Sequence, residues 1–343
     1  MVQIRVLVVD DSDLARELIT AILSTDNEIA IVGEAKNGKE AVEKGRELKP
    51  DIITMDIEMP VMNGLEAIEQ IMATNARPIL VVTTRGDANT AYAAISKGAL
   101  DLVVKPDVNL AEAQEFIQKI KLLSKIKVIT HIGGKHVLRE RSVEKLPVFA
   151  GVTSDRVVAI ASSTGGPEAL SIILSALPET FPCPLVIAQH NSDGFIPGLV
   201  EWLKRVSKVK VKVAEEGETI VPGTAYVSPS ERHMEISILK KVVFVERHPT
   251  DLYRPSCDRL LSSVALAYKA KGIGIILTGM GSDGVGGMKQ IWEWGGTTIA
   301  QDEKTCIVFG MPKVAIESGC IGKILPLDEI SREIISLVAG SPL

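Results

Sequence analysis

The sequence predicts an α/β protein with two domains, each built on a mainly parallel β-sheet. The chain of 343 residues is long enough for two domains. In both halves, short runs of Val, Ile and Leu alternate with segments of helical periodicity, as expected for strands that helices cover on both faces. The alternation stops over residues 124–152, where charges, Gly-Gly and Pro follow no period. We therefore predict one domain at 1–123, a linker at 124–152 and a second domain at 153–343.

The first domain contains five strand-helix repeats, which predict a five-stranded, doubly wound parallel sheet. Each expected strand is an almost continuous apolar run, and the segments between them have the periodicity of helices. The strands are expected at 4–9, 29–34, 52–55, 79–83 and 102–104. The helices are expected at 13–24, 38–48, 64–74, 88–97 and 110–123.

The second domain repeats this rhythm and adds a segment that has strands alone. Its strands are expected at 157–161, 185–188, 209–213, 225–227, 242–245, 273–277 and 297–300. Its helices are expected at 167–177, 195–206, 257–271, 284–294 and 312–319. Because no helical pattern interrupts residues 209–247, we predict a β-hairpin annex on a mainly parallel sheet.

The composition argues against several classes of protein. Hydrophobic residues make up 46% and charged residues 24%, which indicates a packed core, and the net charge of −5 gives no reason to expect nucleic acid as a partner. No apolar run approaches the roughly 18 residues that span a bilayer, and the run at 6–9 is too short for a secretory signal. Four widely spaced cysteines without C-x-x-C fit a reducing compartment. We expect a cytoplasmic monomer without membrane insertion.

Acidic residues follow two of the strands predicted for the first domain. Asp10 and Asp11 come directly after the first strand, and Asp56 follows the third. Ligands of parallel α/β sheets bind beyond the C-terminal ends of the strands, so three carboxylates are expected at one edge. They would repel one another unless a cation binds between them, and hard oxygen ligands suit Mg²⁺. Taken singly, each acid could also be an ordinary loop residue or a helix N-cap.

Two further polar side chains are expected at the same edge. The fourth strand ends at Thr83, and Lys105 follows the fifth. Carboxylates, a metal, a hydroxyl and an ammonium together make a site for phosphoryl transfer, in which a carboxylate attacks and the cations neutralise the phosphoryl oxygens. Asp56 is the predicted nucleophile because it stands alone after a central strand, and Asp10 and Asp11 would hold the metal.

Four motifs of the first domain, "VLVVDDS", "DIITMDIEMPVMNGLEAI", "PILVVTT" and "GALDLVVKP", occur in the order and spacing of a known family. Over residues 4–106 they resemble the receiver domain of two-component response regulators. The resemblance implies phosphorylation of Asp56 by a histidine kinase, a need for Mg²⁺ and a switch at Thr83. It also implies a cis peptide before Pro106, an isomer that X–Pro bonds adopt at low cost. Leu102 departs from the family, because many receivers have an aromatic residue three positions before the lysine.

The second domain begins with a strand, a sharp turn and a helix in "VVAIASSTGGPEALSIIL". Pro167 suits the first position of the helix, which places Ser163 in the turn, beside the backbone N–H groups of the helix start. Such a turn exposes a hydroxyl to an anion-binding cluster of amides. The motif is neither G-x-S-x-G nor a Walker loop, and a helix N-cap is the simpler interpretation of this serine.

A histidine and an aspartate are predicted at two other strand ends. The strand in "PLVIAQH" ends at His190, and the Gly-rich turn after "GIGIILTGM" contains Asp283. With Ser163 they could form a catalytic triad, which is recognised by role and geometry and not by chain order. Ser163 would attack, His190 would take and return the proton, and Asp283 would fix the tautomer of the imidazole. Backbone amides of Thr164 or Met280 could form the oxyanion hole.

Other interpretations of the second domain stay open at this point. "GMGSDG" fits G-x-G-x-x-G after a strand, with Asp302 at a suitable distance for a ribose contact, so a dinucleotide site is an alternative. Against it, Asp283 would place a carboxylate beside the pyrophosphate. His233 and His248 lie in or beside the predicted hairpin and are candidates for substrate contacts.

Six motifs carry a second resemblance: "IASSTGGPEAL", "VIAQH", "VSPSERHMEI", "RPSCDRLLSSVA", "IILTGMGSDGVGGM" and "IAQDEKTCIVFGMPKVAIESG". They resemble the C-terminal domain of the bacterial and archaeal chemotaxis receptor methylesterases, and with the receiver motifs the resemblance covers nearly the whole chain outside the linker. It places Ser163, His190 and Asp283 on the family's triad and the Met280 amide on its oxyanion position. Asn191 departs from the family, in which Met often follows the histidine.

This resemblance implies a complete activity. The family hydrolyses glutamyl methyl esters on chemoreceptors with release of methanol, many members also deamidate receptor glutamines, and phosphorylation of the receiver activates the enzyme. The implied partners are methylated chemoreceptors as substrates and a chemotaxis histidine kinase as phosphodonor, and the esterase chemistry needs no cofactor. A receiver joined to a binding module with an inactive triad is the alternative function.

Overall fold

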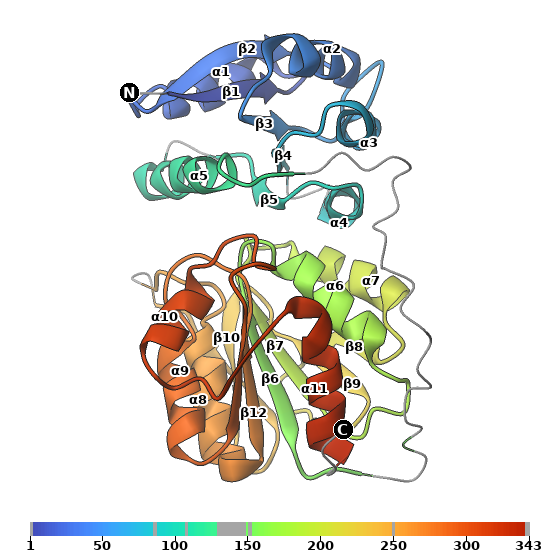
Figure 1. Ribbon diagram of the computed structural model, residues 1–343, viewed down its shortest axis with the longest axis vertical. Coiled ribbons are helices and arrows are strands. Elements are labelled where there is room, and N and C mark those ends of the chain that lie inside the picture. The colour runs from blue at the N-terminus through green and yellow to red at the C-terminus, as the bar shows by residue number, and fades with distance from the viewer. Residues whose placement is uncertain are drawn as a thin grey trace. The chain divides into compact units, whose positions relative to one another are not determined.

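The computed structural model in Figure 1 describes residues 3–84, 88–106, 109–128, 149, 153–248 and 251–339. The chain divides into two units, Met1–Glu144 and Lys145–Leu343. Most of the predicted linker at 124–152 lies outside the described residues, so the domain boundaries stay predictions. No helix in the described ranges is both long and apolar enough to cross a lipid bilayer.

The N-terminal unit has a five-stranded parallel sheet in the order β2-β1-β3-β4-β5, which confirms the predicted doubly wound fold. The strands are β1 (Ile4–Val9), β2 (Ile29–Ala35), β3 (Ile52–Met55), β4 (Ile79–Thr83) and β5 (Asp101–Val104). The helices are α1 (Asp13–Leu23), α2 (Gly38–Leu48), α3 (Gly64–Thr74), α4 (Ala88–Ser96) and α5 (Leu110–Leu123). α1 packs with α5 and α3 packs with α2 and α4, so helices cover both faces and bury the apolar central strands.

The loop after β3 brings the start of α3 against the end of that strand. Asn63 caps α3, because its side chain accepts a hydrogen bond from the amide of Glu66 at 2.9 Å. A Cβ on Gly64 would lie 2.0 Å from the backbone carbonyl oxygen of Asp56, so this close approach requires glycine. The turn therefore fixes the backbone that carries Asp56.

The C-terminal unit has a seven-stranded sheet in the order β14-β13-β12-β6-β7-β9-β8, in which all neighbouring strands are parallel. The strands are β6 (Val157–Ser162), β7 (Leu185–Gln189), β8 (Lys210–Val213), β9 (Thr224–Val227), β12 (Gly272–Ile276), β13 (Thr297–Gln301) and β14 (Lys323–Leu325). The helices are α6 (Gly166–Ala176), α7 (Ile196–Val206), α8 (Cys257–Tyr268), α9 (Val285–Glu293), α10 (Met311–Glu317) and α11 (Leu327–Ala339). α6 packs with α7 and α11, and α9 packs with α8 and α10, so this sheet too is covered on both faces.

The predicted β-hairpin annex exists, but it is smaller than the segment 209–247. β10 (Arg232–Ile236) and β11 (Val242–Glu246) pair antiparallel in a separate two-stranded sheet. β8 and β9 do not belong to it, because residues 214–223 carry the chain back along the sheet and both strands run parallel to β7. This arrangement buries Val211 and Ala225 within the main sheet. The hairpin itself packs against α8.

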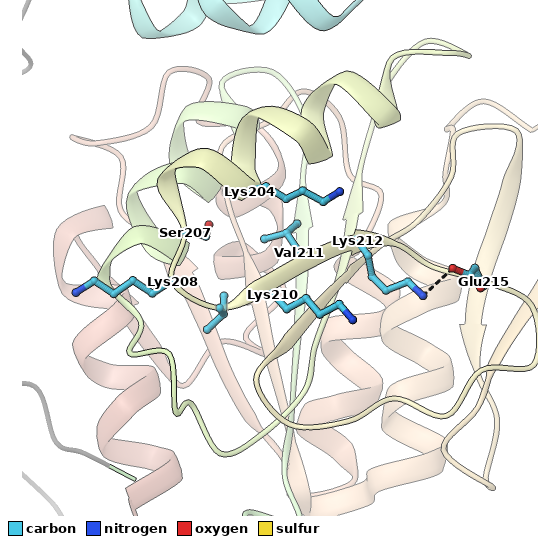
Figure 2. A pocket seen from close by; sticks show the side chains of 8 residues that line it. Lys204, Ser207, Lys208, Lys210, Val211, Lys212 and Glu215 are labelled. Carbon is cyan, nitrogen blue, oxygen red and sulfur yellow. Dashed lines mark hydrogen bonds and ion pairs between the residues drawn. The ribbon is translucent and has the colours of Figure 1, made fainter. Parts of the chain in front are cut away.

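The outer edge of the seven-stranded sheet at β8 carries several lysines. Figure 2 shows Lys204 in α7, Lys208 in the following turn, and Lys210 and Lys212 in β8 around a shallow pocket. Lys212 forms an ion pair with Glu215 at 2.8 Å. Charged side chains on an edge strand discourage pairing with a strand of another molecule. We therefore interpret this pocket as the protected edge of the sheet.

Candidate functional site

The first predicted site lies at the C-terminal edge of the N-terminal sheet. Asp10 follows β1, Asp56 follows β3 and Lys105 follows β5. Lys105 Nζ lies 2.6 Å from Asp10 Oδ2 and 2.8 Å from Asp56 Oδ2. Asp10 and Asp56 are buried, whereas Asp11 is exposed. The structure thus brings one lysine and two acids from three strand ends into direct contact.

The charges at this site influence one another. Burial raises the pKa of the Asp56 carboxyl above its ordinary value, the charge of Asp10 adds to this effect, and the bond to Lys105 opposes it. Burial alone would lower the pKa of the Lys105 ammonium, but its hydrogen bonds to Asp10 and Asp56 raise it instead. Lys105 is therefore firmly protonated and only partly compensates two buried carboxylates.

The acidic residues also suit a divalent cation. One oxygen from each of Asp10, Asp11 and Asp56 lies within 4.8 Å of the others. Asp10 Oδ2 is buried, and the Lys105 ammonium lies 2.6 Å from it. Two buried carboxylates that share one lysine, within a set of hard oxygen donors, fit Mg²⁺.

The remaining receiver residues of the sequence analysis lie on β4 and β5. Thr83 ends β4 and is buried, and its backbone carbonyl accepts the amide of Lys105 at 2.9 Å. Leu102 is buried in β5. The prediction of a cis peptide before Pro106 is wrong, because among the described residues the cis bond is the one before Pro255. The trans isomer is the favoured state of an X–Pro bond, and from it Lys105 already reaches both acids.

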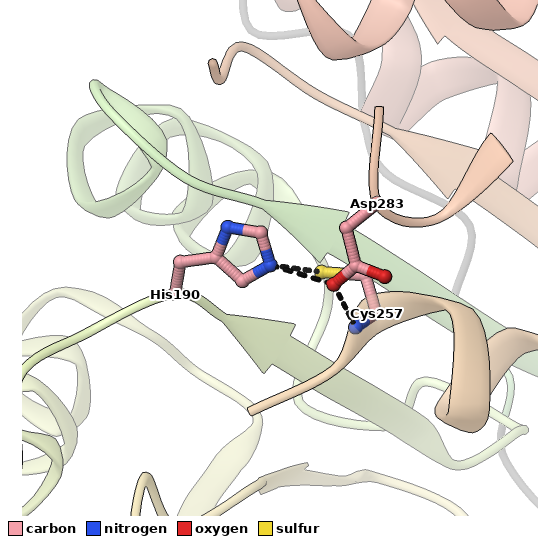
Figure 3. A group of neighbouring side chains, drawn as sticks. All are labelled: His190, Cys257 and Asp283. Carbon is pink, nitrogen blue, oxygen red and sulfur yellow. Dashed lines mark hydrogen bonds and ion pairs between the residues drawn. The ribbon is translucent and has the colours of Figure 1, made fainter. Parts of the chain in front are cut away.

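The second predicted site lies at the C-terminal edge of the seven-stranded sheet. Ser163 follows β6, His190 follows β7, and Asp283 lies in the turn between β12 and α9. His190 Nε2 and Asp283 Oδ2 are 2.8 Å apart. Figure 3 marks this contact with a dashed line. This contact leaves Nδ1 as the ring nitrogen of His190 that can serve a reacting group.

Asp283 lies against the N-terminus of α8. Its carboxylate accepts hydrogen bonds from the amide of Cys257 at 2.6 Å, the amide of Asp258 at 3.0 Å and the hydroxyl of Ser256 at 3.2 Å. Burial alone would raise the pKa of the Asp283 carboxyl, but the bond from His190 and the helix amides hold it below its ordinary value. Asp283 is therefore buried, ionised and held by donors on both of its oxygens.

Two further residues contact His190, and the sequence analysis did not identify them. The ring of Tyr253 stacks on the imidazole, with centroids 5.1 Å apart and an interplanar angle of 13°. Cys257 Sγ lies 3.4 Å from His190 Nε2 (Figure 3). Burial raises the pKa of the Cys257 thiol well above its ordinary value, so the sulfur is a neutral neighbour of the histidine.

The backbone around Ser163 is fixed by the adjacent turn after β12. The amide of Ser163 donates to the carbonyl of Thr278 at 3.0 Å, and its carbonyl accepts the side chain of Gln189 at 2.8 Å. A Cβ on Gly279 would lie 2.7 Å from the Cβ of Ser163, so the two turns touch. The N-cap of α6 is Gly165 and has no side-chain capping bond, so Ser163 is not the helix cap. Within the described chain its hydroxyl has no hydrogen-bond partner, which leaves it available to a substrate.

The two amides expected to form the oxyanion hole flank this serine. Thr164 follows it directly, and its carbonyl accepts the hydroxyl of Thr278 at 2.9 Å. Met280 follows Gly279, whose backbone bonds to Val308 and Met311 at 3.0 and 2.9 Å. Neither the Thr164 amide nor the Met280 amide donates a hydrogen bond within the described chain, so both are available.

The geometry argues against the dinucleotide alternative. Asp258 Oδ1 accepts the amide of Gly287 at 2.8 Å, so a carboxylate already occupies the start of α9. Asp302 accepts the amide of Thr305 at 3.1 Å and thereby closes a tight turn. A pyrophosphate at α9 would therefore meet the negative charges of Asp258 and Asp283.

The two other histidines considered as substrate contacts differ from each other. His233 is completely buried and bonds to protein groups, so the expectation of a substrate contact is wrong for it. β10, the strand that carries and buries this residue, was not recognised from the sequence. His248 is exposed beyond the end of β11.

Comparison with known proteins finds relatives of both units. The chain matches the CheB methylesterase family over residues 158–334 and the response regulator receiver domain over residues 6–120. A protein-glutamate methylesterase/protein-glutamine glutaminase of Paramagnetospirillum magneticum is 44% identical, over 99% of this chain and 97% of that protein. One from Archaeoglobus fulgidus is 42% identical, over 96% of this chain and 97% of that protein.

A solved structure resembles the C-terminal unit. The CheB methylesterase catalytic domain of Thermotoga maritima aligns over 55% of this chain and 100% of its own, with 42% sequence identity and a TM-score of 0.52. The likeness therefore extends from sequence motifs to three-dimensional structure, and the relatives match over almost their whole length. The chain belongs to the CheB methylesterase family and carries a response regulator receiver domain ahead of its methylesterase domain.

Proposed function

We propose that the protein hydrolyses glutamate methyl esters on chemoreceptors, releasing methanol, and that phosphorylation of its receiver domain activates it. Relatives that match along the whole chain are named for this hydrolysis and for glutamine deamidation. The single observation that carries the proposal is the His190–Asp283 pair beside Ser163 at the ends of three parallel strands. A methylated chemoreceptor in the cytoplasm is the substrate, and a chemotaxis histidine kinase is the phosphodonor.

The triad supplies the chemistry of both half-reactions. Ser163 Oγ attacks the ester carbonyl carbon while His190 Nδ1 accepts its proton, and the amides of Thr164 and Met280 bind the oxyanion. His190 then gives the proton to the departing methoxide, so methanol leaves and Ser163 carries the glutamyl acyl group. Water, activated by His190, hydrolyses this ester and restores the hydroxyl. Asp283 holds the Nε2 proton throughout.

The same residues can act on a glutamine side chain. The attack on the carbonyl carbon is unchanged, and the proton from His190 leaves with ammonia in place of methanol. Because the names of the relatives include protein-glutamine glutaminase, we include deamidation as a second reaction of the same site.

In the receiver, Asp56 accepts the phosphoryl group. Asp10, Asp11 and Asp56 would hold the Mg²⁺, which supplies charge neutralisation to the phosphoryl oxygens when bound. Lys105, whose Nζ lies 2.8 Å from Asp56 Oδ2, contributes a second positive charge, and Thr83 responds as the switch residue. The two buried carboxylates of Asp10 and Asp56, which share the single charge of Lys105, support this assignment.

Release of methanol from a methylated receptor tests the assignment of the nucleophile. Ser163→Ala removes only a hydroxyl that has no hydrogen-bond partner in the described chain, so the fold should survive while turnover falls about 10⁴-fold or more. Ser175→Ala is the matched control, because its hydroxyl donates only to Ile172 within α6 at 3.1 Å. Undiminished turnover in Ser163→Ala would overturn the triad, whereas no methanol release by the wild type would favour a binding module with an inactive triad.

A further inference from the structure

A second histidine–aspartate pair, His233 and Asp251, is connected through Ser256 to the pair of His190 and Asp283. His233, on β10, is completely buried, and its Nε2 is 2.8 Å from Asp251 Oδ2. The amide of His248 donates to the same oxygen at 2.7 Å. The mechanism proposed above uses neither His233 nor Asp251.

The partners of His233 define its tautomer. Nδ1 accepts the backbone N–H of Ser256 at 2.9 Å, so this nitrogen carries no proton. Nε2 faces a carboxylate, which can only accept, so this nitrogen carries the proton. The neutral Nε2–H imidazole satisfies both neighbours, and the other tautomer satisfies neither.

Ser256 connects this pair to the catalytic aspartate. It is the N-cap of α8, and its hydroxyl donates to Asp283 Oδ1 at 3.2 Å. The two amides that follow, of Cys257 and Asp258, bind the oxygens of Asp283. The position of Ser256 therefore determines the direction of three donors to Asp283: its own hydroxyl and the amides of Cys257 and Asp258.

The hairpin fixes α8 at a second point. The amide of Ile236, three residues after His233 in β10, donates to the hydroxyl of Ser263 at 2.8 Å. Ser263 lies about two helical turns after Ser256. These two contacts between β10 and α8 thus fix the position of α8 along its axis and its rotation about that axis, relative to Asp283.

We propose that His233 is a positioning residue for hydrolysis, because it holds Ser256 and, through the start of α8, orients Asp283 against His190. This inference rests on the proposed triad. The part of His233 that matters is its Nδ1 acceptor, since that atom binds the first residue of the capping turn. The bond of Nε2 to Asp251 serves to keep Nδ1 free of a proton.

Two substitutions separate the nitrogens of His233. The side-chain oxygen of Asn can stand near the place of Nδ1 and accept the Ser256 N–H, whereas the amide nitrogen of Gln can stand near Nε2 and donate to Asp251. We expect His233→Gln to lower kcat for methanol release about 10- to 100-fold with little change in KM, because misplacing a supporting group affects the chemical step and not binding. His233→Asn should recover most of that loss.

Ser175→Ala, whose hydroxyl donates only to Ile172 within α6, is the control here too and should leave turnover unchanged. If Ser163→Ala is inactive while His233→Gln turns over like the wild type, or if Gln restores kcat better than Asn, the role of the Nδ1 acceptor is rejected. Activity in Ser163→Ala would instead reject the triad itself, so the two failures are distinguishable.

A measurement on the unmodified protein decides the matter if the variants do not fold. Nitrogen-15 NMR of the full chain labelled at histidine reports which ring nitrogen of each imidazole carries the proton. For His233 we expect a protonated Nε2 and an unprotonated, hydrogen-bonded Nδ1. A protonated Nδ1 would contradict the proposal, because such a ring cannot accept the amide of Ser256.

Discussion

Asp283 keeps its charge in a place where burial works against it. A buried carboxylate is stable as an ion only when hydrogen-bond donors replace the water it has lost. Here the donors come from the first turn of α8 and from His190, and together they hold the pKa of this carboxyl below its ordinary value. At the scale of single residues, the site thus depends on a helix start that contributes only backbone amides and one hydroxyl.

The substitution Asp283→Asn tests this role. The amide can still occupy the space, but its nitrogen is a donor facing donors, and it cannot stabilise the cationic imidazole. We expect kcat to fall by up to about 10⁴-fold, with the fold retained. Steady-state methanol release together with circular dichroism provides the measurement, and wild-type turnover in this variant would exclude Asp283 from the triad.

At this scale the sequence predicted the residues that follow strands and missed those that reach the site from elsewhere. Ser163, His190 and Asp283 could be found because parallel strands end at one edge. Tyr253 and Cys257 belong to a segment that arrives from the hairpin, and no local pattern indicates where its helix will begin to pack. The Ser that caps this helix in "RPSCDRLL" was the one available signal.

At the starts of α8 and α9, an acidic residue of each segment accepts backbone amides of the other helix. Asp283, just before α9, binds the first amides of α8, and Asp258, in the first turn of α8, binds the amide of Gly287 in α9. Burial raises the pKa of the Asp258 carboxyl above its ordinary value of 3.8, although the amides of α9 oppose this, and the charge of Asp283 raises it further. At the scale of elements, the ionised form of Asp258 therefore reduces the stability of the folded protein.

That cost has a pH dependence with a definite sign. Because the folded pKa of Asp258 exceeds the unfolded one, the folded state binds more protons in the window between them, and the free energy of unfolding falls as the pH rises through it. Asp258→Asn removes this term and keeps an oxygen for Gly287. We expect the stability of the variant relative to the wild type to increase with pH through this window and then level off. Urea unfolding at a series of pH values measures the difference, and a pH-independent difference would contradict the argument.

Most elements were predictable, and those missed share a reason. The alternation of apolar runs and helical periods predicted every strand of the five-stranded sheet. β10, "RHMEI", was missed because Arg, His and Glu mask a strand whose His233 and Met234 are buried by packing on α8. β14, at the other edge of the seven-stranded sheet from β8, has only three residues, and neither it nor α11 was expected. The secondary structure of such segments depends on tertiary packing, so the local sequence pattern alone does not predict it.

The whole molecule contains two sites of different chemistry, one in each unit. The receiver site concentrates negative charge that a metal and a phosphoryl group would change, whereas the esterase site is built to hold one carboxylate fixed. Only the first is therefore suited to vary with a signal. A change at Asp56 can alter hydrolysis only by shifting a conformational equilibrium, for which a few kcal/mol suffice.

Control by the receiver makes a prediction for the full-length enzyme. A small-molecule phosphodonor with Mg²⁺ should raise methanol release by the wild type, whereas Asp56→Asn should stay at the low basal rate because it lacks the carboxylate nucleophile. Removing Mg²⁺ with a chelator should abolish the activation of the wild type and leave the basal rate unchanged. Activation of Asp56→Asn to the wild-type level would show that the phosphodonor acts elsewhere.

The reciprocal hydrogen bonds of Asp283 to α8 and of Asp258 to α9 also have a consequence for the folding of the esterase site. Asp283 binds the first amides of α8 and Asp258 binds an amide of α9, so the two helices and the carboxylate of Asp283 should order in one cooperative step. A partly folded chain with a competent triad is then not an accessible state. Catalytic competence and tertiary order would be lost together in denaturant, and the assembly of the hydrolase would be all-or-none.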